Sequence, residues 1–241
     1  MLMTNRRYPE LDLLRGLAVL AMITYHLCFD LSFYYGFDIP ITTDVPAALA
    51  HSIATVFLIL IGICFVISWE RTAEKARLRK YAQRALVIFA GAMIVSAVTW
   101  LIDPQTFVIF GILHLVAVST LIQYILRPLK RWNLLLGILI ILAAFTLPAH
   151  SVTTPLLLPF GIMTKNFMSV DYYPLLPWLG PVLIGMGLGD VFYIPERHKA
   201  LSVLDSIRWP RWILWIGRKS LWIYFVHQPV ILLVLWMLLG M

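Results

Sequence analysis

Four ionisable residues interrupt the first long apolar stretch of the chain. Asp12, Arg15, His26 and Asp30 lie among Leu, Val, Ala, Met and Ile residues. On a helix, with about 100° per residue, His26 lies within about 20° of Arg15, and Asp30 follows His26 by one turn. An ionisable group at mid-bilayer costs about 2.5–3.5 kcal/mol, so such a polar stripe should face a protein interior or a water-filled path. The imidazole of His26 could move a proton, and the guanidinium of Arg15 could bind an anion.

Three more histidines lie in or beside later apolar stretches. His51 begins the second stretch, His114 lies about two turns inside the fourth, and His227 lies about two turns into the last. A structural role is the alternative for His227, because Pro229 frees a backbone carbonyl that His227 or Gln228 would satisfy. Straight helices would sort these residues by depth into two groups. The outer group is His26, Asp30, His51 and His114, and the inner group is Arg15, Arg218 and His227.

A structural alternative stays open for the stripe as well. Asp12 and Arg15 would pair near the headgroups, and His26 would only hydrogen-bond a neighbouring helix. We expect no metal cofactor, because no two histidines have the spacing to share a metal on one helix, and Cys28 and Cys64 are the only two cysteines. The sequence also lacks a phosphate-binding glycine loop and a nucleophile elbow. Arg and Lys side chains would therefore hold a phosphate-bearing ligand.

The composition places these residues in a membrane. Of the 241 residues, 61% are hydrophobic and 13% are charged, whereas a soluble domain is roughly half apolar and about a quarter charged. Several runs approach the roughly 20 apolar residues that cross a bilayer. We therefore predict an all-α, polytopic helical bundle that forms a single domain over residues 1–241. The seven expected spans are residues 11–33, 47–69, 85–101, 107–126, 132–147, 175–192 and 221–239.

Basic residues gather in alternate connections between these spans. The formal net charge is +7, and 17 of the 19 Lys and Arg residues lie in connections that share one side of the membrane. The positive-inside rule makes this side cytoplasmic, with the N-terminus inside and, after seven spans, the C-terminus outside. We therefore interpret the charge as an orientation signal and expect no nucleic-acid binding. Residues 209–217, with three tryptophans, should lie at the inner interface, and the outer side should carry residues 34–46 and 148–173.

Four motifs resemble those of a known enzyme family. The opening LDLLRGLA of residues 11–18, followed by His26, is similar to the start of the transmembrane acyltransferase superfamily. The later motifs resemble the bacterial branch of the heparan-alpha-glucosaminide N-acetyltransferase catalytic-domain family. They are FGILH at 110–114, DYYPLLPWLG at 171–180, and GRKSLWIY at 217–224 followed by HQP at 227–229. The resemblance extends over nearly the whole chain.

This resemblance implies a multi-pass acyltransferase of the bacterial cytoplasmic (inner) membrane. It would move an acetyl or other acyl group from cytoplasmic acetyl-CoA or another acyl-CoA to an amine or hydroxyl on the outer side. The acceptor would be an envelope sugar or another glycan-like molecule. Arg15, Arg218 and His227 would bind the acyl-CoA, the two guanidinium groups on its phosphates. Asp38 and Asp171 would contribute to the acceptor site.

The same resemblance implies the catalytic roles. His26 would be the general base, oriented by Asp30, and His114 would donate a hydrogen bond to the thioester oxyanion. In eukaryotic relatives the catalytic histidine lies in the external connection after the first span, but residues 34–46 contain no histidine. Catalysis would then have moved to His26 and His51. Direct transfer between two bound substrates needs fewer assumptions than an acyl-histidine intermediate.

Two other function classes remain open. A transporter of a small polar or anionic solute would show a similar polar stripe, although no inverted repeat is visible in the sequence. A non-catalytic scaffold would tolerate replacement of His26 and Arg15. The expected partners are the lipid bilayer, acyl-CoA and the acceptor, and the sequence also allows a homodimer.

Overall fold

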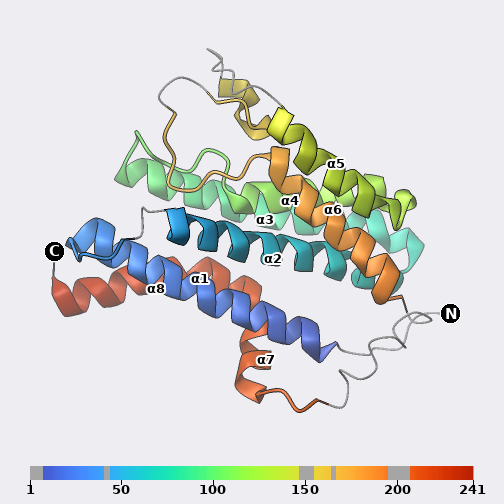
Figure 1. Cartoon of the computed structure of the whole chain (residues 1–241), viewed down its shortest axis with the longest axis horizontal. Helices are drawn as coiled ribbons and strands as arrows, with labels where there is room; N and C mark the ends of the chain where they lie inside the picture. The colour runs from blue at the N-terminus through green and yellow to red at the C-terminus, as the bar shows by residue number, and fades with distance from the viewer. Residues whose placement is uncertain (1–7, 41–43, 147–154, 164–166, 195–206, 241) are drawn as a thin grey trace. The chain divides into compact units, whose positions relative to one another are not determined.

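The computed structural model describes residues 8–40, 44–146, 155–163, 167–194 and 207–240 (Figure 1). All regular secondary structure in these ranges is helical. Six of the helices are long and apolar enough to cross a membrane, and one further apolar helix is shorter. The prediction of an all-α, polytopic membrane protein is confirmed.

The described helices form two compact units. Unit 1 is built from Leu58–Lys199, and unit 2 is built from Arg6–Phe57 together with Ala200–Met241. The helix α2 (Asp44–Glu70) contributes its first half to unit 2 and its second half to unit 1. A single domain over the whole chain stays a prediction.

Unit 2 holds the first and last long helices of the chain. In Figure 1, α1 (Pro9–Tyr35) runs beside α8 (Ser220–Leu239). Proline in the first turn of α1 suits the helix start, because its missing N–H has no partner there, and Glu10 and Asp12 favour the positive end of the helix dipole. The helix ends at Gly36, whose left-handed φ of 69° lets the Phe37 N–H bond the Leu31 carbonyl.

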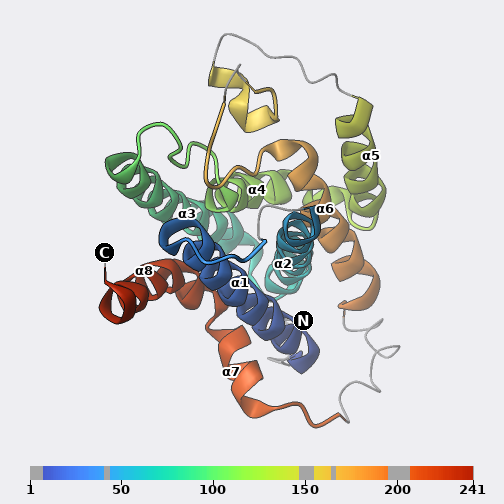
Figure 2. The ribbon, with the colours of Figure 1, turned by 60° about the vertical axis from the view of Figure 1, so that its left-hand side comes forward.

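A short amphipathic helix crosses the beginning of α1. This helix is α7 (Arg211–Arg218), labelled in Figure 2. It exposes Trp212 and Trp215 and buries Ile213 and Gly217. It lies within the stretch for which the sequence predicted an interfacial position. Two glycines allow its close approach, because a Cβ on Gly16 would overlap the Ile213 carbonyl and a Cβ on Gly217 would overlap the Asp12 carbonyl.

Unit 1 contains the remaining helices. Its helices pack as two pairs, α3 with α4 and α5 with α6, and α4 also contacts α6. In the α5–α6 pair, Gly137 and Gly180 face each other so closely that a Cβ on either would overlap the carbonyl oxygen of the other. The elements are α3 (Glu74–Ile102), α4 (Ile112–Leu126), η1 (Arg127–Leu129), α5 (Trp132–Thr146), η2 (Pro155–Phe160) and α6 (Leu175–Phe192).

Two helix starts differ from the predicted spans by more than one turn. The third helix begins at Glu74 instead of residue 85, because the basic segment before the apolar run consists mostly of strong helix formers. The fourth begins at Ile112 instead of residue 107. Residues 107–110 are not helical, and the Phe107 and Phe110 carbonyls instead accept bonds from the Ser169 hydroxyl and the Tyr173 N–H. Residue 147, the expected end of the fifth span, lies outside the described residues.

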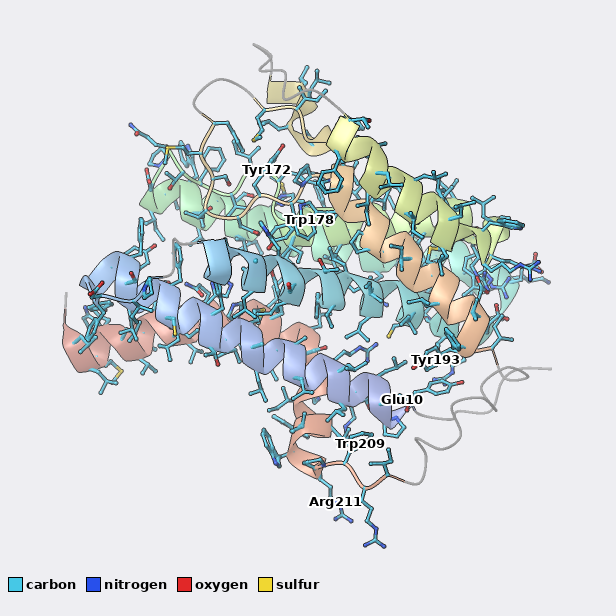
Figure 3. All side chains as sticks on the ribbon, viewed as in Figure 1. Glu10, Tyr172, Trp178, Tyr193, Trp209 and Arg211 are labelled. Carbon is cyan, nitrogen blue, oxygen red and sulfur yellow. The ribbon has the colours of Figure 1, made fainter. Side chains whose placement is uncertain are left out.

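The segment that leads into α6 packs over the connection between α3 and α4. The Val170 N–H bonds the Thr106 carbonyl, and the Tyr172 hydroxyl donates to the Leu158 carbonyl at 2.7 Å. Tyr172 and Trp178 lie at this end of unit 1 in Figure 3. These bonds hold the described part of the predicted outer segment against the start of α4. Residues 148–154 and Lys165 lie outside the described ranges.

Candidate functional site

Among the described residues of unit 2, the most buried carboxylate lies between α1 and α8. Asp30 is 0% exposed, and the Nε2 of Gln228 donates to both of its carboxylate oxygens at 2.9 Å. No hydrogen bond joins Asp30 to His26 among the described contacts. The role of Asp30 in orienting His26 stays a prediction, and the partner that the structure gives to this carboxylate is Gln228.

Two imidazoles lie side by side close to this pair. The ring centroids of His26 on α1 and His227 on α8 are 5.0 Å apart, with the planes tilted by 57°. The His227 ring also lies 5.5 Å from the ring of Tyr224, which in turn stacks on Phe57. His26 has an edge-on contact with Tyr25. Unit 2 therefore brings together two histidines, a carboxylate and an amide.

The contact between His26 and His227 changes the position that we expected for His227 along the membrane-spanning helices. The sequence placed His227 in the inner group with Arg15 and Arg218, but its ring lies against His26, and the next residue binds Asp30. The two histidines therefore do not belong to separate groups. The helix α8 begins directly after α7, whose Gly217 contacts Asp12, so both histidines lie about three to four turns beyond that shared contact. A role for His227 in acyl-CoA binding stays a prediction.

The guanidinium groups proposed for phosphate lie near the start of α1. Arg15 pairs with Asp12 at 3.4 Å on the same helix. Arg218 is the last residue of α7, is exposed, and donates through Nε to the Leu214 carbonyl at 3.2 Å. The contact of Gly217 with Asp12 brings the end of α7 to the first turn of α1. Arg15 and Arg218 therefore lie at the same end of unit 2. An anion site formed by both guanidinium groups would need this arrangement.

The contacts of unit 1 give His114 a defined tautomer. Its Nδ1 accepts a hydrogen bond from the Gly111 N–H at 3.3 Å, so the proton of the neutral ring must lie on Nε2. That Nε2 is buried and has no described hydrogen-bond partner, and the ring packs against Phe110 and Phe89. His114 therefore presents a buried N–H donor, which is the group that its predicted oxyanion role needs.

Asp171 caps the beginning of α4. One of its oxygens accepts the Ile112 N–H at 3.1 Å, and a Cβ on Gly111 would overlap the same carboxylate. Burial raises the pKa of Asp171 to about 6, although the bond from Ile112 acts in the opposite direction. These contacts give Asp171 a structural role that the sequence did not predict. A role in acceptor binding stays a prediction.

The remaining candidates lie on exposed positions. Asp38 is exposed just after the glycine that ends α1, and His51 is exposed in the first part of α2. Both belong to unit 2. Their predicted roles in acceptor binding and catalysis stay predictions. Among the residues that the structure describes, no group of three or more His, Cys, Asp or Glu could hold a metal.

One buried ionic cluster was not found from the sequence. Arg127 is 6% exposed and bonds Asp190 at 2.9 Å and Glu70 at 2.7 Å. The cluster ties the ends of α2 and α6 to η1, all within unit 1. The sequence feature that could have indicated this cluster is Asp190, an acidic residue near the end of an apolar span. The sequence did not identify Gln228 as the partner of Asp30, because Pro229 beside it predicts a bond to a free backbone carbonyl instead.

Comparison with known proteins defines the family. No curated protein and no solved structure matches the chain. The sequence does match the family described as heparan-alpha-glucosaminide N-acetyltransferase, catalytic, over residues 7–229. This range covers most of the chain and ends just after His227 and Gln228. The chain therefore belongs to the heparan-alpha-glucosaminide N-acetyltransferase catalytic-domain family.

Proposed function

We propose that the protein is an integral membrane acyltransferase that uses acyl-CoA. It would pass an acetyl or other acyl group to an amine or hydroxyl of an envelope sugar or similar glycan. The single observation that carries this proposal is the family match over residues 7–229, which includes every candidate residue named above. The family description names an N-acetyltransferase, so acetyl-CoA is the first donor to test.

The basic end of unit 2 supports the donor side of the proposal. Arg15 and Arg218 belong to the first turns of α1 and the end of α7, which the Gly217–Asp12 contact brings together. Guanidinium groups bind phosphate oxygens through paired hydrogen bonds, and the nucleotide part of acyl-CoA carries several phosphates. From the positive-inside rule we infer that this end faces the cytoplasm, where acyl-CoA would be available.

The neighbouring imidazoles of His26 and His227 support the proton transfers that acyl transfer needs. When an amine or hydroxyl attacks a thioester, it gives up a proton, and the leaving thiolate takes one up. A neutral imidazole can take up the first proton at physiological pH, and the imidazolium that forms can then give it to the thiolate. His26 and His227 lie 5.0 Å apart between α1 and α8, beside the buried Asp30–Gln228 pair. We propose that this group moves the proton, that His114 supplies an N–H donor, and that Asp38 and His51 take part on the acceptor side.

The test uses purified protein in lipid nanodiscs with acetyl-CoA and glucosamine. We expect release of free CoA thiol and formation of acetylated glucosamine. His26→Ala should strongly reduce transfer and leave acetyl-CoA binding unchanged, whereas Arg218→Ala should weaken binding. A transporter would instead move glucosamine into proteoliposomes without releasing thiol. Failure of acyl-CoA of any chain length to bind at micromolar concentration would remove the basis of the proposal.

A further inference from the structure

The two neighbouring histidines of unit 2 differ in their hydrogen bonds. The Nδ1 of His227 lies 2.7 Å from the Tyr224 carbonyl oxygen. A carbonyl oxygen can only accept, so Nδ1 must carry the proton. In the neutral ring, Nε2 then holds the lone pair. The backbone of α8 therefore fixes the tautomer of His227 and decides which nitrogen is basic.

The basic nitrogen of His227 is buried and unused. Its Nε2 has no hydrogen-bond partner among the described residues, and the residue is 8% exposed. A buried acceptor without a partner destabilises the fold, so an unused one in a protein interior needs an explanation. A substrate N–H or O–H that donates to this lone pair would satisfy it.

His26 lacks such a constraint. Its described contacts are with the rings of Tyr25 and His227, and no described hydrogen bond fixes either of its nitrogens. Its tautomer is therefore free to change as it gains and loses a proton. This suits a group that relays a proton better than one that must present a lone pair in a fixed direction.

We propose that His227 is the general base of the acyl transfer, an inference that rests on the proposed function. The Nε2 lone pair of His227 takes the proton of the acceptor N–H or O–H while the acceptor atom bonds the thioester carbonyl carbon. The tetrahedral adduct then breaks its C–S bond. The thiolate takes the proton from the His227 imidazolium, directly or through His26. The products are the acylated acceptor and the free thiol of CoA, and both histidines return to the neutral state.

The adjacent polar pair holds this base in place. Gln228 directly follows His227, and its amide binds the Asp30 carboxylate of α1 at 2.9 Å. The turn of α8 that carries His227 is therefore fixed to the turn of α1 that follows His26. The lone pair is thus aimed by two contacts, the Tyr224 carbonyl on its own helix and the Asp30–Gln228 bond between helices.

The experiment compares His227→Gln with His26→Gln. Glutamine at position 227 can still donate to the Tyr224 carbonyl but cannot act as a base. We expect kcat for transfer from acetyl-CoA to glucosamine to fall about 100-fold or more, and further than in His26→Gln, with the Kd for acetyl-CoA unchanged. The control is Val226→Ala, the neighbouring residue, which is 50% exposed and should keep the activity of the unchanged protein.

Chemical rescue keeps the test decisive if His227→Gln binds acetyl-CoA poorly. Added imidazole should restore part of the activity of His227→Ala, because it replaces the missing base, and it should not change Val226→Ala. The inference is overturned if His227→Gln keeps activity within tenfold while His26→Gln loses it, or if imidazole restores nothing. If the unchanged protein releases no thiol at all, the proposed function itself fails, and the two failures are therefore distinguishable.

Discussion

The side-chain amide of Gln228 lies 2.9 Å from both carboxylate oxygens of Asp30. The two residues belong to the last and first long helices, and Asp30 is fully buried. A carboxylate buried in a membrane protein usually has a cation as partner. Here the partner is a neutral amide, so the pair adds polarity to the helix contact without neutralising charge.

Replacing Gln228 by leucine should destabilise the protein. The substitution leaves the Asp30 carboxylate buried without a donor, which costs about 1–3 kcal/mol and more if the group is charged. Thermal unfolding in detergent should show a lower midpoint for Gln228→Leu. Adding Asp30→Leu should recover much of the loss, since neither polar group is then left alone. A single variant as stable as the unchanged protein would show that the bond contributes nothing.

Removing Arg218 should weaken acyl-CoA binding. A hydrogen bond to a charged group contributes about 1.5–3 kcal/mol, so Arg218→Ala should raise the Kd for acetyl-CoA roughly 10- to 100-fold. Arg211→Ala is the matched control, because Arg211 is an arginine on the same helix that extends away from α1 in Figure 3. Titration calorimetry in nanodiscs measures the Kd for acetyl-CoA of both variants. Equal effects of the two substitutions would indicate a general charge effect.

Removing Arg127 should lower the free energy of unfolding more than Gln228→Leu does. Arg127→Met leaves Asp190 and Glu70 without their described cation, and breaking a buried ion pair costs about 3–5 kcal/mol. The unfolding midpoint should fall sharply. Arg131→Met, at an exposed position nearby, should have little effect. A double variant, Arg127→Met with Asp190→Leu, should be more stable than Arg127→Met alone.

Gly217 should not tolerate a methyl group. A Cβ at this position would overlap the Asp12 carbonyl, so Gly217→Ala must push α7 away from α1. Overpacking of this kind costs about 1–3 kcal/mol. We expect a lower unfolding midpoint and weaker acetyl-CoA binding, because Arg218 moves with the helix. Arg211→Ala, which leaves the contact intact, should not lower the midpoint.

Asp171 should make stability depend on pH. Burial raises its pKa to about 6, so the folded protein holds this proton more tightly than the unfolded chain. Its contribution to stability is complete below the ordinary carboxyl pKa of about 4 and is lost as the pH rises through 6. Asp171→Asn mimics the protonated acid and removes this loss.

The measurement compares unfolding midpoints between pH 4 and pH 6.5. The unchanged protein should lose stability relative to Asp171→Asn as the pH rises over this range. Asp38→Asn, at an exposed position, serves as the control. Parallel pH curves for the unchanged protein and Asp171→Asn would contradict the role of burial.

The apolar runs predicted the helices better than they predicted the site. Span 175–192 coincides with α6, and the first, second and last spans lie within α1, α2 and α8. Such runs are long enough that hydrophobicity alone decides their structure. Span 107–126 began too early because the bonds that keep residues 107–110 out of the helix come from residues 169 and 173, about 60 positions away.

The partners of the polar residues were the least predictable feature. Periodicity showed that His26 and Asp30 share a face of one helix, but it contains no information about the facing helix. The structure supplies that information, with His227 against His26 and Gln228 on Asp30. The sequence places Arg127 among the basic residues of a connection, but the structure buries it. Sequence patterns therefore identified residues in a polar interior, and the contacts between helices decided their roles.

The Asp30–Gln228 bond also has a consequence for biosynthesis. The two residues are 198 positions apart, so a ribosome that adds about 5–20 residues per second finishes Gln228 on the order of 10–40 s after Asp30. During that interval the carboxylate has already been delivered to the membrane and its final partner does not yet exist. Water, the insertion machinery or protonation must shield Asp30 until the last helix arrives, and the closing of this bond marks the completed assembly of the nascent chain.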